Sequence, residues 1–345
     1  MRAYLDWNAS APLRPEARDA MLSAMDVVGN PSSVHAEGRR ARGLIERARA
    51  QVAEAFGAAS ADVVFTSGAT EAAALALAGR DLAASGTEHD CVAAWTRDVL
   101  ATDGEGRVTV PEPAASALQA ANSETGVIQA LPEGLAVTDA VQAFGKVPFA
   151  FDWSGAEAAL ISGHKIGGPK GVGALVLRRG ADVPAQLRGG GQELGRRAGT
   201  ENAIGIAGFG AAAAAAQRDL EAGEWDRVAY LRNILESLLE AGAGQTIFVG
   251  KGAARLPNTS CLAVPGWKGE TQVMQMDLAG YAVSAGSACA SGKVRAGRVL
   301  RAMGLEGAAG CAIRVSLGPA TTEGEVRGFA EAWLRAHDTY RARAA

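Results

Sequence analysis

The sequence predicts an α/β protein with a large domain built on a mostly parallel central sheet and a smaller α/β domain. Helical and strand patterns alternate through most of the chain, and the short apolar runs are bounded by Gly, Pro or Asp. After Gly250 the pattern changes to separated strands followed by a helix. We therefore expect the large domain to span residues 15–248 and the small domain to combine residues 1–14 with 249–345.

The individual elements follow from periodicity and capping signals. Apolar positions at helical spacing predict helices over residues 34–56 and 69–84, and the Ala- and Gly-rich run 203–216 predicts a tightly packed helix. The capping box Thr322-x-x-Glu325 predicts the start of a last helix. The predicted strands are 62–66, 136–138, 158–162, 173–177, 260–264 and 312–317.

Composition excludes several classes of protein. The 345 residues are 48% hydrophobic, which suffices for a buried core, and 34 Lys and Arg against 37 Asp and Glu leave no cationic excess for nucleic acid. Four cysteines without CxxC or His-bracketed spacing predict no metal site and suit a reducing compartment. We expect a cytoplasmic protein, because the start of the chain shows no targeting signal and the 203–216 run is too short to span a membrane.

A lysine directly follows one predicted strand. Ser162-Gly163-His164-Lys165 stands between strand 158–162 and a Gly-rich loop over 167–173. A lysine among small residues at such an edge can be desolvated, which lowers its pKa towards a free amine that can form a Schiff base. Lys165 is equally compatible with a surface lysine before an ordinary glycine loop, so its interpretation depends on its neighbours.

An aspartate ends another predicted strand. Asp139 closes the run Val137-Thr138-Asp139, and Gln142 follows three residues later. In a pyridoxal-phosphate site an aspartate keeps the pyridine nitrogen protonated, so that the ring can withdraw electrons. Asp139 suits this role, although an aspartate after a strand is more often a helix N-cap.

Residues 66–71 join a predicted strand to a helix and form a candidate phosphate cradle. Backbone amides at Gly68 and Ala69 and the Thr70 hydroxyl meet at the positive end of the helix dipole. A well-capped helix start is the alternative, and the absence of GxxxxGK[ST] and GxGxxG argues against a P-loop or dinucleotide site. His89 follows this unit, where an imidazole can stack on a planar ring and shuttle protons, although a lone histidine is usually structural.

Two further residues have candidate chemical roles. Cys289 stands in a run of small residues with Lys293 and Arg295 nearby, and such cations stabilise a reactive thiolate. Arg314 interrupts an apolar strand, where it can bind a substrate carboxylate or form an internal salt bridge. Both interpretations of Arg314 remain open. The remaining strand-flanking cysteines, Cys261 and Cys311, are expected in the core.

Taken in order, these motifs resemble the cysteine desulfurases of the class V aminotransferase group, particularly the iron–sulphur and nitrogen-fixation type. The similarity covers nearly the whole chain, and the joint order of the motifs is far more specific than any one of them. The matching segments are Tyr4-Leu5-Asp6, Gly29-Asn30-Pro31-Ser32-Ser33-x-His35, Thr66-Ser67-Gly68-Ala69-Thr70-Glu71, Asp139-Ala140-Val141-Gln142, Ser162-Gly163-His164-Lys165, Gly189-Gly190-Gly191-Gln192-Glu193, Gly199-Thr200-Glu201-Asn202, Gly286-Ser287-Ala288-Cys289 and Arg314-Val315-Ser316-Leu317-Gly318.

The resemblance implies a pyridoxal-phosphate transferase fold of fold type I, with pyridoxal 5'-phosphate as cofactor. Lys165 would be the Schiff-base lysine, Asp139 the pyridinium partner and His89 the residue stacked on the ring. Gln142 would donate a hydrogen bond to the ring oxygen. The phosphate would be held by Gly68, Ala69, Thr70, Ser162 and His164, together with Thr200 from a second subunit, which implies a homodimer.

The resemblance also implies the substrate and the reaction. L-cysteine would bind through Arg314, with Asn122, Ser123 and Asn30 as further contacts. Cys289 would attack the substrate sulphur, leaving L-alanine and an enzyme persulfide. The sulphur would then pass to an acceptor protein such as an iron–sulphur scaffold.

The chain departs from the family pattern in three places. Ser123 replaces the second asparagine of the usual Asn-Asn-Glu run. The segment 129–138 is shortened and lacks the pattern of the usual helix between two strands. Only 31 residues follow Arg314, fewer than in the housekeeping enzymes whose C-terminal tail docks the scaffold.

Three classes of function are compatible with these residues: a desulfurase, a related enzyme such as a selenocysteine lyase or small-substrate aminotransferase, and a non-catalytic partner that retains the fold. The Cys289 loop favours the first class, because a transaminase needs no mobile thiol. The set of Lys165, Asp139 and His89 disfavours the third.

Overall fold

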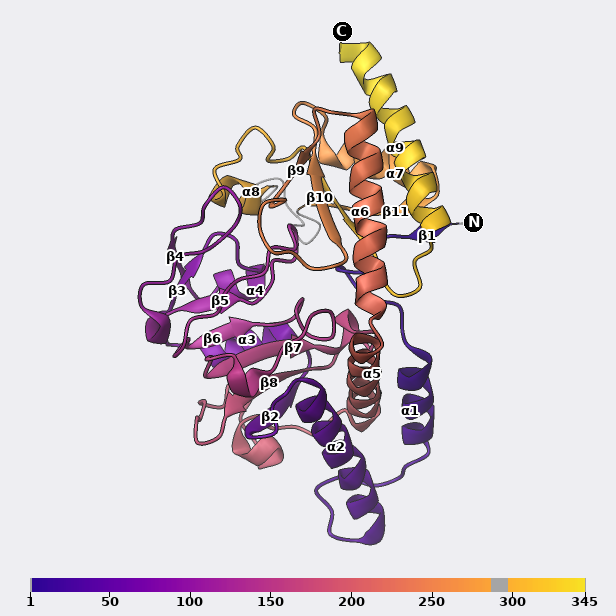
Figure 1. Ribbon diagram of the computed structural model, residues 1–345. Coiled ribbons are helices and arrows are strands. Elements are labelled where there is room, and N and C mark those ends of the chain that lie inside the picture. Colours follow the sequence, from indigo (N-terminus) through magenta and orange to yellow (C-terminus); the bar gives the residue numbers. More distant parts are fainter. Residues whose placement is uncertain (1, 287–296, 345) are drawn as a thin grey trace.

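The computed structural model describes residues 2–286 and 297–344, with a five-stranded sheet in the large part of the molecule (Figure 1). Strands β5, β6 and β7 run parallel to one another, while β8 runs antiparallel to both of its neighbours, β7 and β2. The α/β class is confirmed. The one reversed strand results from the short loop between β7 and β8. The order is β2 (Ala61–Thr66), β8 (Gly173–Arg178), β7 (Ala158–Ser162), β6 (Val137–Asp139) and β5 (Ala117–Gln119).

Strand β7 shows why both faces of this sheet are covered. Its alternating side chains belong to two different buried clusters, Ala159 and Ile161 to one and Ala158 and Leu160 to the other. Helices α2 and α5 pack on the first face and α3 on the second. The helices of this part are α1 (Pro15–Met25), α2 (Ala36–Ala55), α3 (Ala69–Leu77), α4 (Asp90–Ala93) and α5 (Ala203–Glu221).

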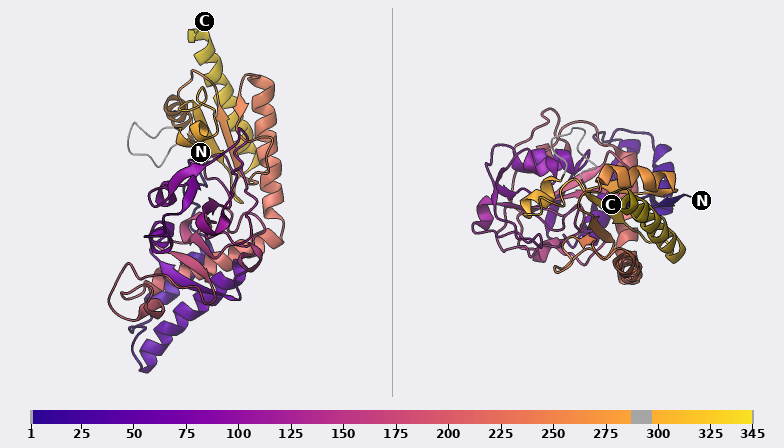
Figure 2. Two further views of the ribbon diagram at one scale, coloured as in Figure 1. Left: turned by 90° about the vertical axis from the view of Figure 1, so that its left-hand side faces the viewer. Right: turned by 90° about the horizontal axis from the view of Figure 1, so that it is seen from above.

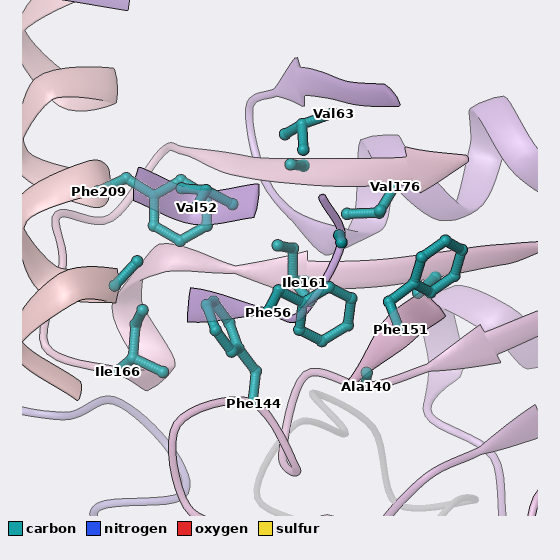
Figure 3. Packing of buried hydrophobic residues seen from close by; sticks show 14 of the residues in the cluster. Val52, Phe56, Val63, Ala140, Phe144, Phe151, Ile161, Ile166, Val176 and Phe209 are labelled. Atoms are coloured by element: carbon teal, nitrogen blue, oxygen red, sulfur yellow. The ribbon is translucent and has the colours of Figure 1, made fainter. Parts of the chain in front are cut away.

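Aromatic rings fill the first cluster (Figure 3). The Phe56 ring lies edge-on to Phe144 with their centroids 5.0 Å apart, and it stacks on Phe149 at 4.9 Å. Such pairs add to the stabilisation from apolar burial. The rigid sheet that results positions the ends of its strands.

A second sheet of four antiparallel strands lies at one end of the elongated molecule, with α2 at the other (Figure 2). Its order is β12 (Ser284–Ala285), β13 (Ala312–Ser316), β10 (Thr259–Ala263) and β9 (Ile247–Phe248). The N-terminal strand β1 (Ala3–Tyr4) joins this part by pairing with β11 (Tyr281–Ala282). Its helices are α6 (Glu224–Gly242), α7 (Gly269–Leu278), α8 (Arg298–Ala302) and α9 (Glu323–Ala344).

The capping box at the start of α9 is confirmed. The Glu325 amide donates to Thr322 Oγ1 at 3.2 Å, and the Thr322 amide donates back to Glu325 Oε2 at 2.8 Å. The predicted division at residue 248 stays a prediction. Helix α6 lies before that position, and its apolar residues pack with β10 and β13 in one buried cluster.

The helix predicted over residues 69–84 is too long. Helix α3 ends at Leu77, because Ala78 has an extended ψ of 121° and Gly79 has a positive φ of 76°. Residues after this turn form β3 (Ala83–Ser85), which pairs with β4 (Arg97–Leu100). The short helical turns are η1 (Pro113–Ala115), η2 (Phe151–Trp153), η3 (Gly163–Lys165) and η4 (Gln192–Gly195).

Within residues 2–286 and 297–344, no helix combines the length and the apolar character needed to cross a membrane.

Candidate active site

The ends of three strands bring predicted site residues to one edge of the five-stranded sheet. Thr66, Asp139 and Ser162 are the last residues of β2, β6 and β7, which all run in the same direction. Thr66 and Ser162 both pair with Gly173 on the intervening strand β8. The carboxyl ends of parallel strands are the usual place for ligand binding in such sheets.

The start of helix α3 lies beside this edge. Gly68 is its N-cap residue, and no side chain caps the helix. A Cβ on Gly173 would lie 2.8 Å from Gly68 Cα, so the close approach of the two segments requires glycine. The uncapped amides that follow Gly68, at Ala69 and Thr70, suit an anionic group such as a phosphate.

Lys165 extends from η3 directly after β7, as the sequence predicts. Its Nζ donates to the carbonyl oxygens of Asn8 at 2.7 Å and Ala9 at 3.0 Å. These contacts join the N-terminal segment to the strand edge.

Asp139 is buried close to His89 and Lys165. Burial raises the pKa of Asp139, while His89, the Val141 amide and Lys165 each oppose that rise. The Val141 amide donates to Asp139 Oδ1 at 2.9 Å. Asp139 thus lies in the electrostatic range of both His89 and Lys165, which is the grouping that the sequence predicts.

His89 is the N-cap residue of α4, and its orientation is fixed by that position. Nδ1 accepts the Cys91 amide at 3.2 Å, so the neutral ring carries its proton on Nε2. The same nitrogen lies 3.0 Å from Cys91 Sγ. His89 therefore has a structural role in α4 and can also present a protonated Nε2 to a ligand.

Several lysine charges act on His164. Burial, together with the nearby charges of Lys165 and Lys170, lowers the pKa of His164 to about 4. His164 is therefore neutral at neutral pH and can donate one ring N–H. An anion would relieve this accumulation of positive charge, so these residues fit a phosphate-bearing cofactor.

Asn8 and Lys146 complete the site but are not predicted from the sequence. The Asn8 carbonyl accepts from both Lys165 Nζ and Gln142 Nε2, the latter at 3.0 Å. Lys146 Nζ donates to Asn8 Oδ1 at 2.9 Å and to Gln142 Oε1. The i,i+4 spacing of Gln142 and Lys146 is the one signal that could have linked them.

Arg314 lies in the middle of β13 and forms the internal salt bridge that the sequence leaves as an alternative. Its Nη2 donates to Asp6 Oδ1 at 2.7 Å, and its Nη1 donates to the Ser123 carbonyl at 2.9 Å. Its buried Nε has no hydrogen-bond partner among the described residues. The salt bridge therefore does not use the full donor capacity of the guanidinium.

Asn122 has a structural role in its own turn. Its Oδ1 accepts from the amides of Glu124 at 2.9 Å and Thr125 at 2.8 Å, and its Nδ2 donates to the Thr87 carbonyl at 3.0 Å. This turn presents the Ser123 carbonyl to Arg314. The predicted contacts of Asn122 and Ser123 with substrate stay predictions.

Asn30 and Thr200 are both exposed in this chain. Asn30 is exposed in the α1–α2 loop, which lies at the end of the molecule away from the four-stranded sheet (Figure 1). Thr200 is exposed in the segment between β8 and α5, which an Arg197–Glu71 ion pair of 2.8 Å joins to α3.

Cys289 lies outside the described residues, but the residues on both sides of segment 287–296 contact the site. A Cβ on Gly286 would lie 3.3 Å from Glu124 Oε2. Arg298 donates to the Glu88 carbonyl and, at 3.1 Å, to Asp90 Oδ1, on either side of His89 in the sequence. Gly286 and Arg298, on either side of segment 287–296, therefore lie next to residues of the candidate active site.

The other cysteines differ in their surroundings. Cys261 is fully buried in β10, and burial raises its pKa to about 12. Burial also raises the pKa of Cys91. Cys261 is in the core as expected, whereas Cys311 is only half-buried.

Comparison with known proteins identifies the family. The model of the class-V aminotransferases matches residues 3–329, so the chain belongs to this family. A protein named cysteine desulfurase from Cereibacter sphaeroides is 40% identical over 94% of this chain and 93% of its own length. A cysteine desulfurase IscS from Dictyoglomus turgidum is 36% identical over 93% of this chain and 90% of its own.

The fold has close counterparts among solved structures. The X-ray structure of a NifS-like protein from Rickettsia africae has a TM-score of 0.90 and 32% identity, covering 98% of this chain and all of that one. A structure described as SspA in complex with cysteine has a TM-score of 0.74 and 26% identity over 93% of this chain and all of that one. These similarities confirm the predicted fold class.

Proposed function

We propose that this chain is a cysteine desulfurase that uses pyridoxal 5'-phosphate to remove sulphur from L-cysteine. The observation that carries the proposal is the grouping of Asp139, Lys165 and His89 at the strand edge beside the uncapped start of α3. Desulfurase relatives that match along more than nine tenths of the chain support the substrate and the reaction.

The residues of the site fit the cofactor, and each would bind a different part of it. Lys165 would bind it covalently, Asp139 would hold its ring nitrogen protonated, and His89 would stack on the ring. Gln142 would donate to the ring oxygen. The α3 amides, Thr70, Ser162 and His164 would hold the phosphate. When bound, the cofactor supplies an electron-withdrawing ring that stabilises negative charge on the substrate.

The chain's own residues would then carry the sulphur. Arg314 would hold the substrate carboxylate through its remaining N–H groups. The Cys289 thiolate would form an S–S bond with the substrate sulphur as the C–S bond breaks. The electron pair of that bond stays with carbon, which gains a proton, so that L-alanine leaves and Cys289 retains a persulfide. Cys261 is a poor candidate for this attack, because its buried thiol stays protonated.

The assembly and the sulphur acceptor are part of the same proposal. A homodimer would supply Thr200 to the neighbouring copy, and the exposed position of Thr200 is compatible with this. The persulfide sulphur would pass to an acceptor protein in the cytoplasm, such as an iron–sulphur scaffold.

The test begins with the visible absorption of the purified protein after it is loaded with pyridoxal phosphate. We expect a cofactor band that is lost in Lys165→Ala. Addition of L-cysteine should then yield equal amounts of alanine and, with a thiol reductant, sulphide. A wild-type protein without the band would contradict the cofactor assignment. A protein with the band that produces no sulphide would contradict the desulfurase activity.

A further inference from the structure

Lys146 lies beside the candidate active site and has no acidic partner within the described chain. It is only 2% exposed, in the turn that follows β6. Burial lowers its pKa well below the usual range, and the positive charges of Lys165 and Arg314 lower it further. A lysine enclosed in this way is more stable as a neutral amine. Lys146 is thus not one half of a structural ion pair.

The hydrogen bonds of Lys146 match the neutral form. Nζ donates to Asn8 Oδ1 at 2.9 Å and to Gln142 Oε1. A neutral amine has two hydrogens, and both are used. The third hydrogen of an ammonium group would have no acceptor among the described residues.

These bonds also determine which way the Gln142 amide points. Its Oε1 accepts from Lys146, and its Nε2 donates to the Asn8 carbonyl at 3.0 Å. With the amide reversed, Gln142 Oε1 would face the Asn8 carbonyl and two acceptors would meet. Lys165 Nζ donates to that same carbonyl at 2.7 Å. The orientation therefore places the N–H group of Gln142 on the side of Lys165.

We infer that Lys146 is a positioning residue of the cofactor site, which holds the Gln142 amide with its N–H group towards Lys165. The inference rests on the proposed function, because that function assigns Gln142 to the ring oxygen of the cofactor. Lys146 acts through Gln142, so its role depends on its N–H groups as hydrogen-bond donors.

The experiment follows the visible absorption of the cofactor-loaded enzyme as a function of pH. Lys146→Met removes the donor and keeps most of the side-chain volume, while Gln142→Leu removes the amide. We expect both to move the midpoint of the spectral titration in the same direction, by about one pH unit for the loss of one buried hydrogen bond. The double variant should shift no further than Gln142→Leu alone.

Two further variants separate positioning from other roles. Lys146→Gln keeps an N–H donor and should retain the wild-type midpoint. Lys251→Met is the matched control, because Lys251 is exposed and pairs with Glu240 at 2.9 Å. It should also leave the midpoint unchanged.

Additive shifts in the double variant, or an unchanged midpoint in Lys146→Met, would overturn the inference. If Lys146→Met does not fold, Lys146→Gln decides: a shifted midpoint would show that the amine acts by its charge. Failure of the proposed function is distinguishable. A wrong reaction would leave the band and this titration in place but yield no sulphide, whereas a wrong cofactor would leave wild-type protein without the band. In that case, urea unfolding of the cofactor-free wild type, Lys146→Met, Gln142→Leu and the double variant tests the contact between Lys146 and Gln142. Independent effects of the two substitutions on the free energy of unfolding would overturn the inference.

Discussion

Two arginines near the four-stranded sheet are equally buried but have different partners. The side chains of Arg255 and Arg314 are each 6% exposed. Arg255 forms a two-point contact with the Glu236 carboxylate, at 2.8 and 2.9 Å. Arg314 has single contacts to the Asp6 carboxylate and the Ser123 carbonyl, and its Nε is left without a partner in the described chain.

The pKa values of carboxyl groups near the two arginines also differ. Burial alone would raise the pKa of Glu236, but the hydrogen bonds and charge of Arg255 outweigh it and lower the pKa. For Glu124, burial outweighs the opposing charges of Arg314 and Arg298 and raises the pKa to about 7. Arg255 is therefore a completed structural pair, whereas Arg314 retains an N–H group without a partner in the described chain.

The largest expected effect is on stability, at the completed pair. Arg255→Leu would leave the buried Glu236 carboxylate without its partner and should lower the free energy of unfolding by about 3–5 kcal/mol. Urea unfolding measures this, with Arg255→Leu/Glu236→Leu as the control that should recover part of the loss. Cofactor binding should be unchanged. A loss below 1 kcal/mol would show that the pair behaves as an exposed one.

At Arg314 the expected effect falls on the ligand. Arg314→Ala should weaken cysteine binding by about 2–5 kcal/mol, because a charge-assisted contact with the substrate carboxylate is lost. The concentration of cysteine that half-saturates the spectral change of the loaded enzyme measures the affinity. Cofactor affinity should stay the same. Normal cysteine binding in this variant would reduce Arg314 to a structural salt bridge.

The pH dependence of stability should have opposite signs at the two sites. The pKa of Glu124 rises from 4.5 to about 7 on folding, so its stabilising contribution is complete below pH 4.5 and is lost as pH rises to 7. The contribution of Glu236 is present above pH 4.5 and is lost as pH falls, because its pKa is lowered.

Unfolding free energies at pH 5 and pH 8 test this difference. Relative to wild type, Glu124→Gln should become more stable by about 1–3 kcal/mol between the two pH values. Glu236→Gln should not gain in this way. An equal gain in stability between pH 5 and pH 8 in both variants would show that Glu124 and Glu236 do not differ in this respect. The distinction between the surroundings of Arg314 and Arg255 would then be lost.

The smallest effect is expected at Ser123, although this residue departs from the family pattern. Arg314 contacts its carbonyl oxygen, and its hydroxyl has no hydrogen-bond partner in the described structure. Ser123→Ala should therefore change stability by less than about 0.5 kcal/mol. Cysteine affinity, measured by the same titration, should also stay close to wild type. A large loss of affinity would reveal a side-chain role in substrate binding.

The strand edge of the site could be predicted because local patterns determine it. Apolar runs that end at Asp139 and Ser162 identify two strands, and parallel strands place their carboxyl ends together. Lys165 follows from its position after the second strand. By contrast, the predicted helix runs past the true end of α3 at Leu77, because it continues through Gly79, whose positive φ and lack of a Cβ mark a helix end.

The polar contacts between distant segments could not be predicted. Lys146 meets Asn8 across 138 positions, and Arg314 meets Asp6 across 308. Periodicity carries no information on which buried donor finds which acceptor, because that depends on the packed tertiary structure. The resemblance to a family assigns roles to Arg314 and Gln142, but it does not indicate what else holds them.

Peptide mass spectrometry of the cofactor-loaded enzyme after treatment with L-cysteine tests the central claim most directly. The account predicts one added sulphur atom on the peptide that contains Cys289, and none on those containing Cys91, Cys261 or Cys311. Cys289→Ser should retain the cofactor band and its change on adding cysteine, yet form almost no alanine or sulphide. Added sulphur on another cysteine, or full activity of Cys289→Ser, would contradict the account.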